Sequence, residues 1–201
     1  PQEAAEQHYS ACLKYRYMIA GFGLDANEHD RPPKLFDDVF RRARANGFKV
    51  TAHCDVGVKN THEHIRQVAY TVAEGLDRID HGLNTADKAE LIDIVKKRRL
   101  ALTICPWAYL RRETYESIAD RLKTLVDAGV IVCIGSDGPP YMDDCWVTHN
   151  LMLARQMGGF TNAQLVALMR NAVDASWASV KIKESLSIEL EEYIQKNAEY
   201  S

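Results

Sequence analysis

The chain has 201 residues, of which 46% are hydrophobic, and it carries a formal net charge of -3 at pH 7. A nearly balanced charge without a long basic run gives no sign of a nucleic-acid or membrane-surface partner. No stretch approaches the roughly 18 to 20 apolar residues that a membrane span needs. These numbers favour one globular domain over residues 1–201 that buries a sizeable core.

Five cysteines, an odd number at irregular spacing, argue against a disulfide framework. They favour a reducing compartment, and we therefore expect the protein to be cytoplasmic. The opening stretch, PQEAAEQHYSACLKYRY, is polar, does not begin with methionine and lacks the pattern of a signal peptide. Such a start is typical of the middle of a longer protein.

Apolar runs typical of strands alternate five times with amphipathic runs typical of helices. The predicted strands cover residues 17–24, 48–52, 77–80, 100–104 and 130–134. The helices between them are predicted at about 33–46, 60–72, 87–95 and 113–127. Two or three helices without strands follow, one of them starting at a capping box of Thr161 and Gln164 and another forming an amphipathic tail over about 183–200.

Two helix starts carry specific predictions. Asn60 with Glu63 forms a plausible capping box, and Asp87 is expected to start the following helix together with Glu90. His62 and His64 would then lie in a first helical turn, where side chains two positions apart point about 200° apart around the helix axis. We therefore interpret these two histidines as a solvated first turn rather than as a metal-binding pair.

The strands are nearly continuous in apolar residues, which is typical of parallel strands that helices cover on both faces. A closed barrel and a doubly wound sheet both satisfy this pattern. In either fold, the loops that follow the carboxyl ends of the strands build the functional site.

Four of the five predicted strands end in an aspartate or a histidine: Asp25, His53, His81 and Asp137. Neutral imidazole and carboxylate groups suit zinc, which can keep one position open for a water molecule and lower the pKa of that water. Each residue alone is more often structural, and GSDGP at 135–139 is by itself a good turn. Their joint placement after apolar strands favours a metal site.

Six segments in order extend this interpretation to a known family. They are GLDANEHDRPPKLF at 23–36, TAHCD at 51–55, DRIDHG at 77–82, LTICPWAYL at 102–110, GSDGP at 135–139 and LMRNAVDASW at 168–177. Together they resemble the strand-end motifs of the adenosine/adenine deaminases of the amidohydrolase superfamily. In these motifs a T-x-H, an R-I-x-H-G, a C-P and a T/S-D-D-P sequence follow one another.

The resemblance implies an α/β fold of the (β/α)8 TIM-barrel class. This chain would hold about the last five β/α units plus the C-terminal helices, and thus be the C-terminal part of a metal-dependent deaminase barrel whose N-terminal strands are absent. A complete barrel of this class takes about 250 residues. The implied reaction is zinc-dependent hydrolytic deamination of a small-molecule 6-aminopurine by a metal-bound hydroxide, with release of ammonia.

Position by position, the resemblance implies that His53 is a zinc ligand. It makes Asp137 a second ligand and the group that accepts a proton from the attacking water. His81 would orient that water and stabilise charge. No nucleic-acid or membrane partner is implied, and the sequence indicates neither an oligomeric state nor a choice between nucleoside and free base.

The chain departs from the family pattern at two positions. The family continues its T-x-H motif as H-A-G-E, and the acid that protonates the purine ring is here replaced by Val56. Asp55 is the nearest substitute and our predicted catalytic acid, with Glu28 as another candidate on the first loop. The second aspartate of the D-D-P motif, which contacts the purine, is Gly138. We expect Asp25, Glu28 and Gly138 to line the substrate site.

Two other hypotheses remain open. The missing acid at Val56, together with Gly138, also fits a decayed or non-catalytic deaminase-like protein that binds a purine or a partner without turnover. A doubly wound α/β binding module is a third interpretation, and it predicts a protein without zinc.

Overall fold

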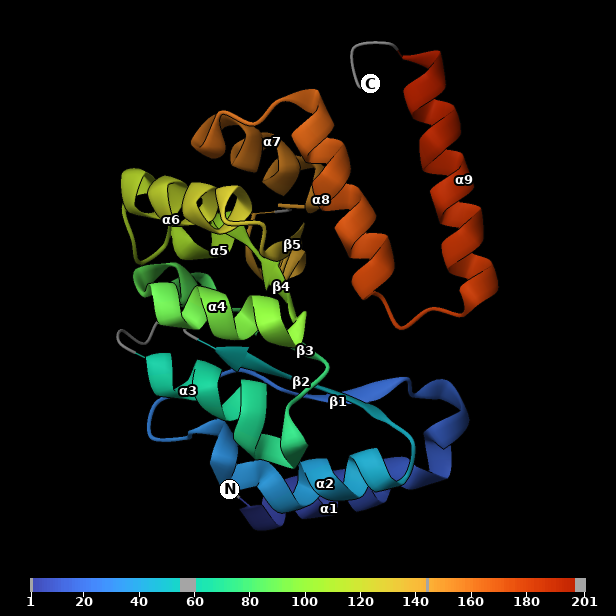
Figure 1. The fold of residues 1–201 in the computed structure, drawn as a ribbon. Helices are drawn as coiled ribbons and strands as arrows, with labels where there is room; N and C mark the ends of the chain where they lie inside the picture. The colour runs from blue at the N-terminus through green and yellow to red at the C-terminus, as the bar shows by residue number, and fades with distance from the viewer. Residues whose placement is uncertain (1, 55–60, 144, 198–201) are drawn as a thin grey trace. The chain divides into compact units, whose positions relative to one another are not determined.

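The computed structural model describes residues 2–54, 61–143 and 145–197 (Figure 1). Its strands are β1 Gly21–Leu24, β2 Lys49–Cys54, β3 Arg78–His81, β4 Ala101–Ile104 and β5 Ile131–Ile134. They form one sheet in the order β1-β2-β3-β4-β5, and β2 pairs in parallel with both β1 and β3. A doubly wound sheet reverses its strand order at a switch point. The sequential order seen here is that of a barrel.

All five predicted strands are present, but the first one is shorter than expected. Residues Leu13–Met18 form a 3-10 helix, η1, and β1 therefore begins only at Gly21. The side chains of Tyr17 and Met18 are exposed. The apolar residues at the start of this run thus belong to a surface turn and not to the sheet.

By its contacts the chain divides into two compact units, Pro1–Leu102 and Thr103–Ser201. The helical elements of the first unit are α1 Gln2–Cys12, η1, η2 Pro33–Phe36, α2 Asp37–Ala45, α3 His62–Arg66, η3 Gln67–Thr71, η4 Val72–Glu74, η5 Leu83–Asp87 and α4 Ala89–Arg98. Those of the second unit are α5 Pro106–Tyr109, α6 Tyr115–Asp127, η6 Pro139–Tyr141, α7 Val147–Gly158, α8 Asn162–Ala175 and α9 Val180–Lys196.

The central strand of the first unit has one apolar and one polar face. Alternate residues of a strand point to opposite faces, and the apolar face of β2 is fully buried; it consists of Val50, Ala52 and Cys54. On the other face the Thr51 hydroxyl donates to the Asp80 carboxylate over 2.9 Å, and Arg78 Nε donates to the same carboxylate over 3.1 Å. His53 shares this polar face with Thr51 and is the register partner of Asp80.

The helix predicted over 60–72 is regular only at its start. α3 ends at Arg66, a π-helical turn follows over Gln67–Thr71, and a 3-10 turn over Val72–Glu74 contains Ala73 at φ +46°. The Asp37 carboxylate accepts a hydrogen bond from the Ala73 amide over 2.7 Å. Because that amide is bonded to Asp37, it does not continue the hydrogen bonds of the preceding helical turns.

The two predicted helix caps in the first unit have different outcomes. Asn60 lies outside the described residues, and Thr61 is the N-cap of α3. The expected start at Asp87 is wrong: Asp87 ends η5, and α4 begins at Ala89 after the N-cap Lys88. The Asp87 carboxylate is engaged in a contact with α3 that is described below.

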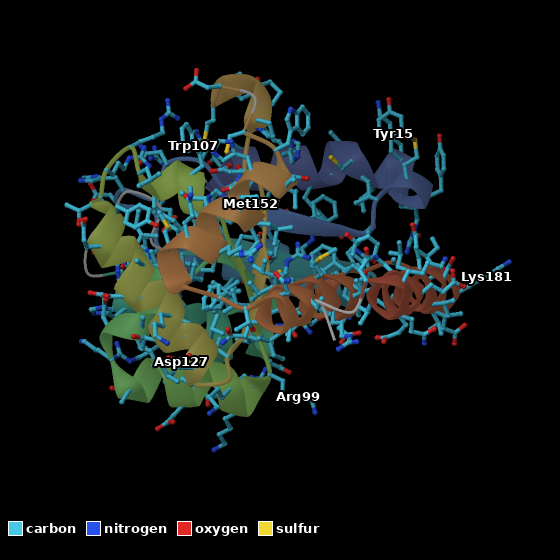
Figure 2. The ribbon with its side chains drawn as sticks, turned by 90° about the horizontal axis from the view of Figure 1, so that it is seen from above. Tyr15, Arg99, Trp107, Asp127, Met152 and Lys181 are labelled. Atoms are coloured by element: carbon cyan, nitrogen blue, oxygen red, sulfur yellow. The ribbon has the colours of Figure 1, made fainter. Side chains whose placement is uncertain are left out.

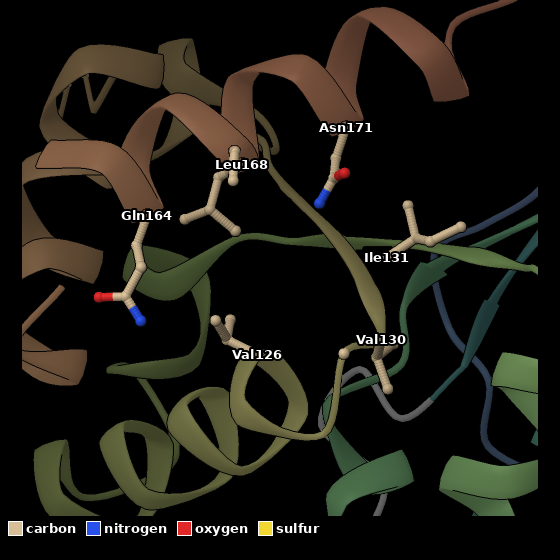
Figure 3. Close-up of a pocket in the computed structure, with 8 residues that line it drawn as sticks. Val126, Val130, Ile131, Gln164, Leu168 and Asn171 are labelled. Carbon is tan, nitrogen blue, oxygen red and sulfur yellow. The ribbon is translucent and has the colours of Figure 1, made fainter. Parts of the chain in front are cut away.

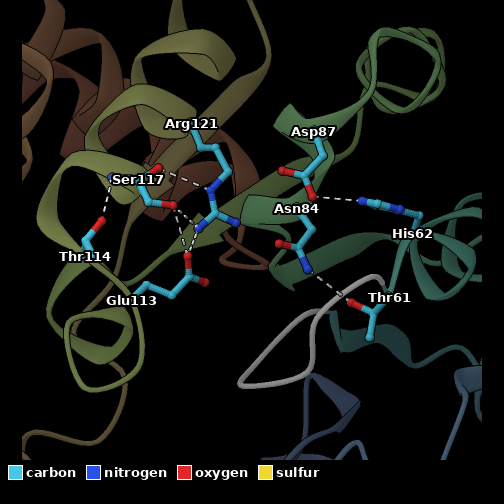
Figure 4. A network of polar contacts seen from close by, with 8 residues as sticks. All are labelled: Thr61, His62, Asn84, Asp87, Glu113, Thr114, Ser117 and Arg121. Atoms are coloured by element: carbon cyan, nitrogen blue, oxygen red, sulfur yellow. Dashed lines mark hydrogen bonds and ion pairs between the residues drawn. The ribbon is translucent and has the colours of Figure 1, made fainter.

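In the second unit the helix starts follow the sequence closely. The Thr114 hydroxyl accepts a hydrogen bond from the Ser117 amide at the start of α6, and Arg121 makes an ion pair with Glu113, which directly precedes Thr114 (Figure 4). The capping box of Thr161 and Gln164 is confirmed at α8.

The C-terminal helix α9 is amphipathic, as predicted for the tail. Its residues Leu190 and Ile194 are buried with Val166 of α8, while Lys181 and much of the rest is exposed (Figure 2). Among the described residues, none of the helices has the length and apolar character that a membrane span requires.

Candidate active site

Two of the predicted strand-end histidines lie side by side in the first unit. His53 belongs to β2 and His81 is the last residue of β3, and their ring centroids are 4.6 Å apart with the planes at 85°. His81 is buried. The Nδ1 atom of His53 is also buried and makes no hydrogen bond among the residues that the structure describes. A buried ring nitrogen without a structural partner is suited to bind a ligand.

The backbone is strained at two of the predicted residues. His81 has φ +64° and Asp137 has φ +57°, in the left-handed region that non-glycine residues rarely adopt. Such a conformation costs about 1–2 kcal/mol per residue, and strain of this kind concentrates at functional sites. Gly82, which follows His81 at φ +81°, donates its amide to the Cys54 carbonyl over 3.0 Å and so fixes the turn after β3.

The side chains of His62 and His64 in the first turn of α3 are mostly buried, so the prediction that they are solvated is wrong. His62 Nε2 lies 2.8 Å from Asp87 Oδ2, and the side chains are 12% and 33% exposed. His64 Nδ1 lies 3.6 Å from Glu28 Oε2, and these side chains are 15% and 4% exposed. Figure 4 shows the His62–Asp87 contact and the bond from Asn84 to the Thr61 hydroxyl beside it.

Each imidazole of α3 therefore meets a carboxylate from a different loop of the first unit. Glu28 follows β1, and Asp87 follows β3. Sequence reasoning missed both pairs because the partners lie 36 and 25 positions apart. The available signal was the coincidence of two histidines with carboxylates in the neighbouring strand-end loops.

The remaining predicted residues lie in strand-end loops. Asp25 directly follows β1 and is exposed, whereas Glu28 in the same loop is buried. Asp137 and Gly138 follow β5 in the second unit, and Asp137 is exposed. Asp55 lies outside the described residues, so its predicted role stays a prediction.

In the second unit, aromatic and polar contacts tie together the segments that follow β4 and β5. The rings of Trp107 and His149 lie 5.0 Å apart, and the Trp107 amide donates to the buried Asn150 side chain over 3.0 Å. Burial raises the pKa of the Cys145 thiol, although a hydrogen bond from Asn150 opposes the shift. A neutral thiol at physiological pH is a poor nucleophile and a poor metal ligand.

A pocket of about 260 Å³ lies elsewhere in the second unit (Figure 3). Its walls come from the end of α6, the start of β5 and one side of α8; they are Val126, Gly129, Val130, Ile131, Gln164, Ala167, Leu168 and Asn171. The pocket opens at the amino end of β5, whereas Asp137 follows its carboxyl end. Because sites of parallel β/α folds form at the carboxyl ends, this pocket is not the predicted site.

The donor chemistry at His53 fits a zinc ion. Its imidazole has a buried nitrogen that no described residue uses, and a second imidazole lies beside it. Within residues 2–54, 61–143 and 145–197, no group of three or more histidine, cysteine, aspartate or glutamate side chains is arranged to hold a metal. A complete zinc site therefore needs ligands in addition to those that the described part of the chain brings together.

The adenosine deaminase family profile matches residues 1–193. The chain belongs to the adenosine deaminase family. An uncharacterised deaminase of Schizosaccharomyces pombe is 40% identical over 178 residues, which cover 88% of this chain and 51% of that protein. An adenine deaminase of Crocosphaera subtropica is 31% identical over 188 residues, 93% of this chain and 56% of that protein.

A solved structure gives the same result for the fold. An amidohydrolase of Burkholderia ambifaria with bound zinc superposes with a TM-score of 0.87 at 26% identity, covering 98% of this chain and 54% of that chain. The predicted TIM-barrel class is thereby confirmed. This chain spans about half the length of the relatives that it matches.

Proposed function

We propose that residues 1–201 act as the C-terminal part of a zinc-dependent aminohydrolase that removes the amino group of a 6-aminopurine as ammonia. The observation that carries this proposal is the pair of His53 and His81, of which His53 has a buried nitrogen that no described residue uses. Family membership and the adenine deaminases among the relatives support a purine as the substrate class.

In this proposal His53 and Asp137 hold the zinc together with ligands from outside the described residues. A zinc ion so held makes a water molecule a good nucleophile near neutral pH. Asp137 accepts a proton from that water, and its backbone is in the left-handed region at φ +57°. His81 stabilises the negative charge that develops on the attacking oxygen.

The substrate contacts are assigned to the strand-end loops. Asp25, Glu28 and Gly138 line the purine site, and Asp55 is one candidate for the residue that protonates the purine ring. The site is built on loops at the carboxyl ends of parallel strands, as in other proteins of this architecture. The protein is proposed to act in the cytoplasm on a small molecule.

A second candidate function follows from Val56 and Gly138. A protein without a proton donor would bind a purine or a partner and not turn it over. The two functions differ in whether the purified protein releases ammonia.

The test uses the full-length protein that contains residues 1–201, purified with its metal. Ammonia release is measured with adenine, adenosine and other 6-aminopurines, before and after zinc is removed with a chelator. The proposal expects turnover of at least one purine that is lost with the zinc and restored by adding it back. Tight binding of a purine without ammonia release would favour the binding protein.

A further inference from the structure

We propose that Glu28, positioned by His64, is the proton donor to the purine ring and replaces the acid that the family has at the position of Val56. This inference rests on the proposed function. It places the proton donor in the loop after β1, whereas the earlier candidate, Asp55, follows β2.

The burial of Glu28 is the first observation. Its side chain is 4% exposed, and that of its partner His64 is 15% exposed. A buried carboxylate is costly unless it is neutral or paired. Glu28 is a carboxylate of this kind, and we assign a chemical role to it.

The geometry of the contact is the second observation. Glu28 Oε2 and His64 Nδ1 are 3.6 Å apart, which exceeds the 3.2 Å limit of a good hydrogen bond. His62, two residues before His64 in the same helix, lies only 2.8 Å from Asp87. Catalytic pairs are often long in the absence of substrate and tighten when it binds. The Glu28–His64 distance fits that behaviour and the His62–Asp87 distance fits a structural link.

The place of the pair in the first unit is the third observation. Leu24 at the end of β1 is paired with Ala52 of β2, so the carboxyl ends of both strands lie at one edge of the sheet. Glu28 follows the end of β1, and His64 lies in the first turn of α3, which follows β2. His53 and His81 stand at the same edge, where the reaction is proposed to occur.

Other charged groups in the loop after β1 and on α3 form ion pairs or hydrogen bonds that do not include Glu28. His29 and Asp30 form an exposed pair at 2.8 Å, and the Arg31 side chain donates to the His29 carbonyl. On α3, Arg66 binds Glu63 and Glu90. The carboxylates of these pairs are exposed, with Asp30, Glu63 and Glu90 at 89%, 65% and 61%, whereas the Glu28 side chain is 4% exposed.

The proposed step balances in protons and electrons. The water oxygen bonds to the carbon that carries the amino group, its proton passes to Asp137, and the adjacent ring nitrogen takes the displaced electron pair and a proton from the Glu28 carboxyl. The bond to the amino nitrogen then breaks, and ammonia leaves with the proton from Asp137. The remaining hydroxyl becomes a carbonyl and returns its proton to Glu28.

The experiment compares Glu28→Gln and Glu28→Asp with Asp87→Asn in the full-length, zinc-loaded protein. We expect Glu28→Gln to lower kcat by about 10² to 10⁴-fold with little change in KM, and to remove the fall of the rate at high pH that a required donor causes. Glu28→Asp keeps part of the rate, and Asp87→Asn keeps nearly all of it. Unchanged kcat and pH profile in Glu28→Gln would overturn the inference.

Two further measurements distinguish a loss of folding, or a failure of the proposed function, from the loss of the proton donor. Where Glu28→Gln shows no cooperative thermal unfolding, Glu28→Asp and His64→Asn are measured in its place, and a pH profile equal to that of the wild type in both contradicts the inference. A wild-type protein that deaminates no purine contradicts the proposed function itself. An active wild type with an equally active Glu28→Gln contradicts the role of Glu28 alone.

Discussion

Two ends of the short helix α3 hold carboxylates in opposite ways. At its first turn His64 faces Glu28, whose side chain is 4% exposed, across 3.6 Å. At its last residue Arg66 faces Glu90, whose side chain is 61% exposed, across 2.9 Å. His62 and Asp87 are intermediate in exposure, with a carboxylate side chain 33% exposed, and their contact is 2.8 Å long.

The contrast separates a contact that serves stability from one that serves chemistry. An ion pair that stabilises a buried site needs close geometry to offset the loss of hydration. Here the most buried pair is the longest one, and the shorter pairs are those that water can reach. The length of the Glu28–His64 contact is therefore not that of a pair that mainly serves stability, and we assign the pair to the proposed reaction.

The largest effect is expected from moving the acidic side chain from position 28 to position 56. Val56→Glu in the Glu28→Gln protein should restore kcat by about 10²-fold or more, because it returns a donor to the family's position. The same Val56→Glu change in the wild type should give no comparable gain, since Glu28 already supplies the proton. Steady-state ammonia release from the single and double variants checks both; a large gain from Val56→Glu alone would mean that Glu28 is not the donor.

A smaller effect is expected from the structural pair. Asp87→Asn should lower the free energy of unfolding by about 1 kcal/mol, as for a partly buried hydrogen-bonded pair, and lower Tm by about 2–4 °C in a chain of this size. Thermal unfolding followed by circular dichroism measures it, with Asp93→Asn at an exposed site of α4 as the matched control. Equal Tm values for the two variants would contradict the link.

The smallest effect on stability is expected from the exposed pair. A hydrogen bond from Arg66, together with its charge, holds the pKa of the Glu90 carboxyl below its usual value. The stabilisation is thus present above the unfolded-state pKa of Glu90 and is lost as the pH falls through the lower folded-state pKa. In an NMR titration, Arg66→Gln should raise the Glu90 pKa and Lys97→Gln should not; an unmoved Glu90 titration in Arg66→Gln would argue against this pair in solution.

Much of the fold could be predicted because it depends on local patterns. The strands are short apolar runs bounded by polar residues, and the capping box at Thr161 needs only the four residues that form it. The pairing of His53 with His81 also followed from sequence, because both stand at the ends of apolar strands. Parallel strands bring such ends to one edge.

The contacts of the first turn of α3 could not be predicted, because they depend on residues that are far apart in the sequence. Asp87 has the right spacing to Glu90 for a helix start, yet it binds His62, which is 25 positions away. A local cap and a tertiary contact compete for the same carboxylate. The sequence pattern indicates the cap but not the tertiary contact. The burial of Glu28, in a polar stretch with His29 and Asp30, likewise involves a contact with a distant residue, His64, 36 positions away.

The most direct test is the zinc content of the full-length protein, measured together with ammonia release from a 6-aminopurine, for the wild type, His53→Asn and His29→Asn. The histidine at 29 is exposed and serves as the control. The account predicts that the wild type and His29→Asn retain zinc and release ammonia, while His53→Asn loses both. Zinc retained in full by an active His53→Asn protein would contradict it.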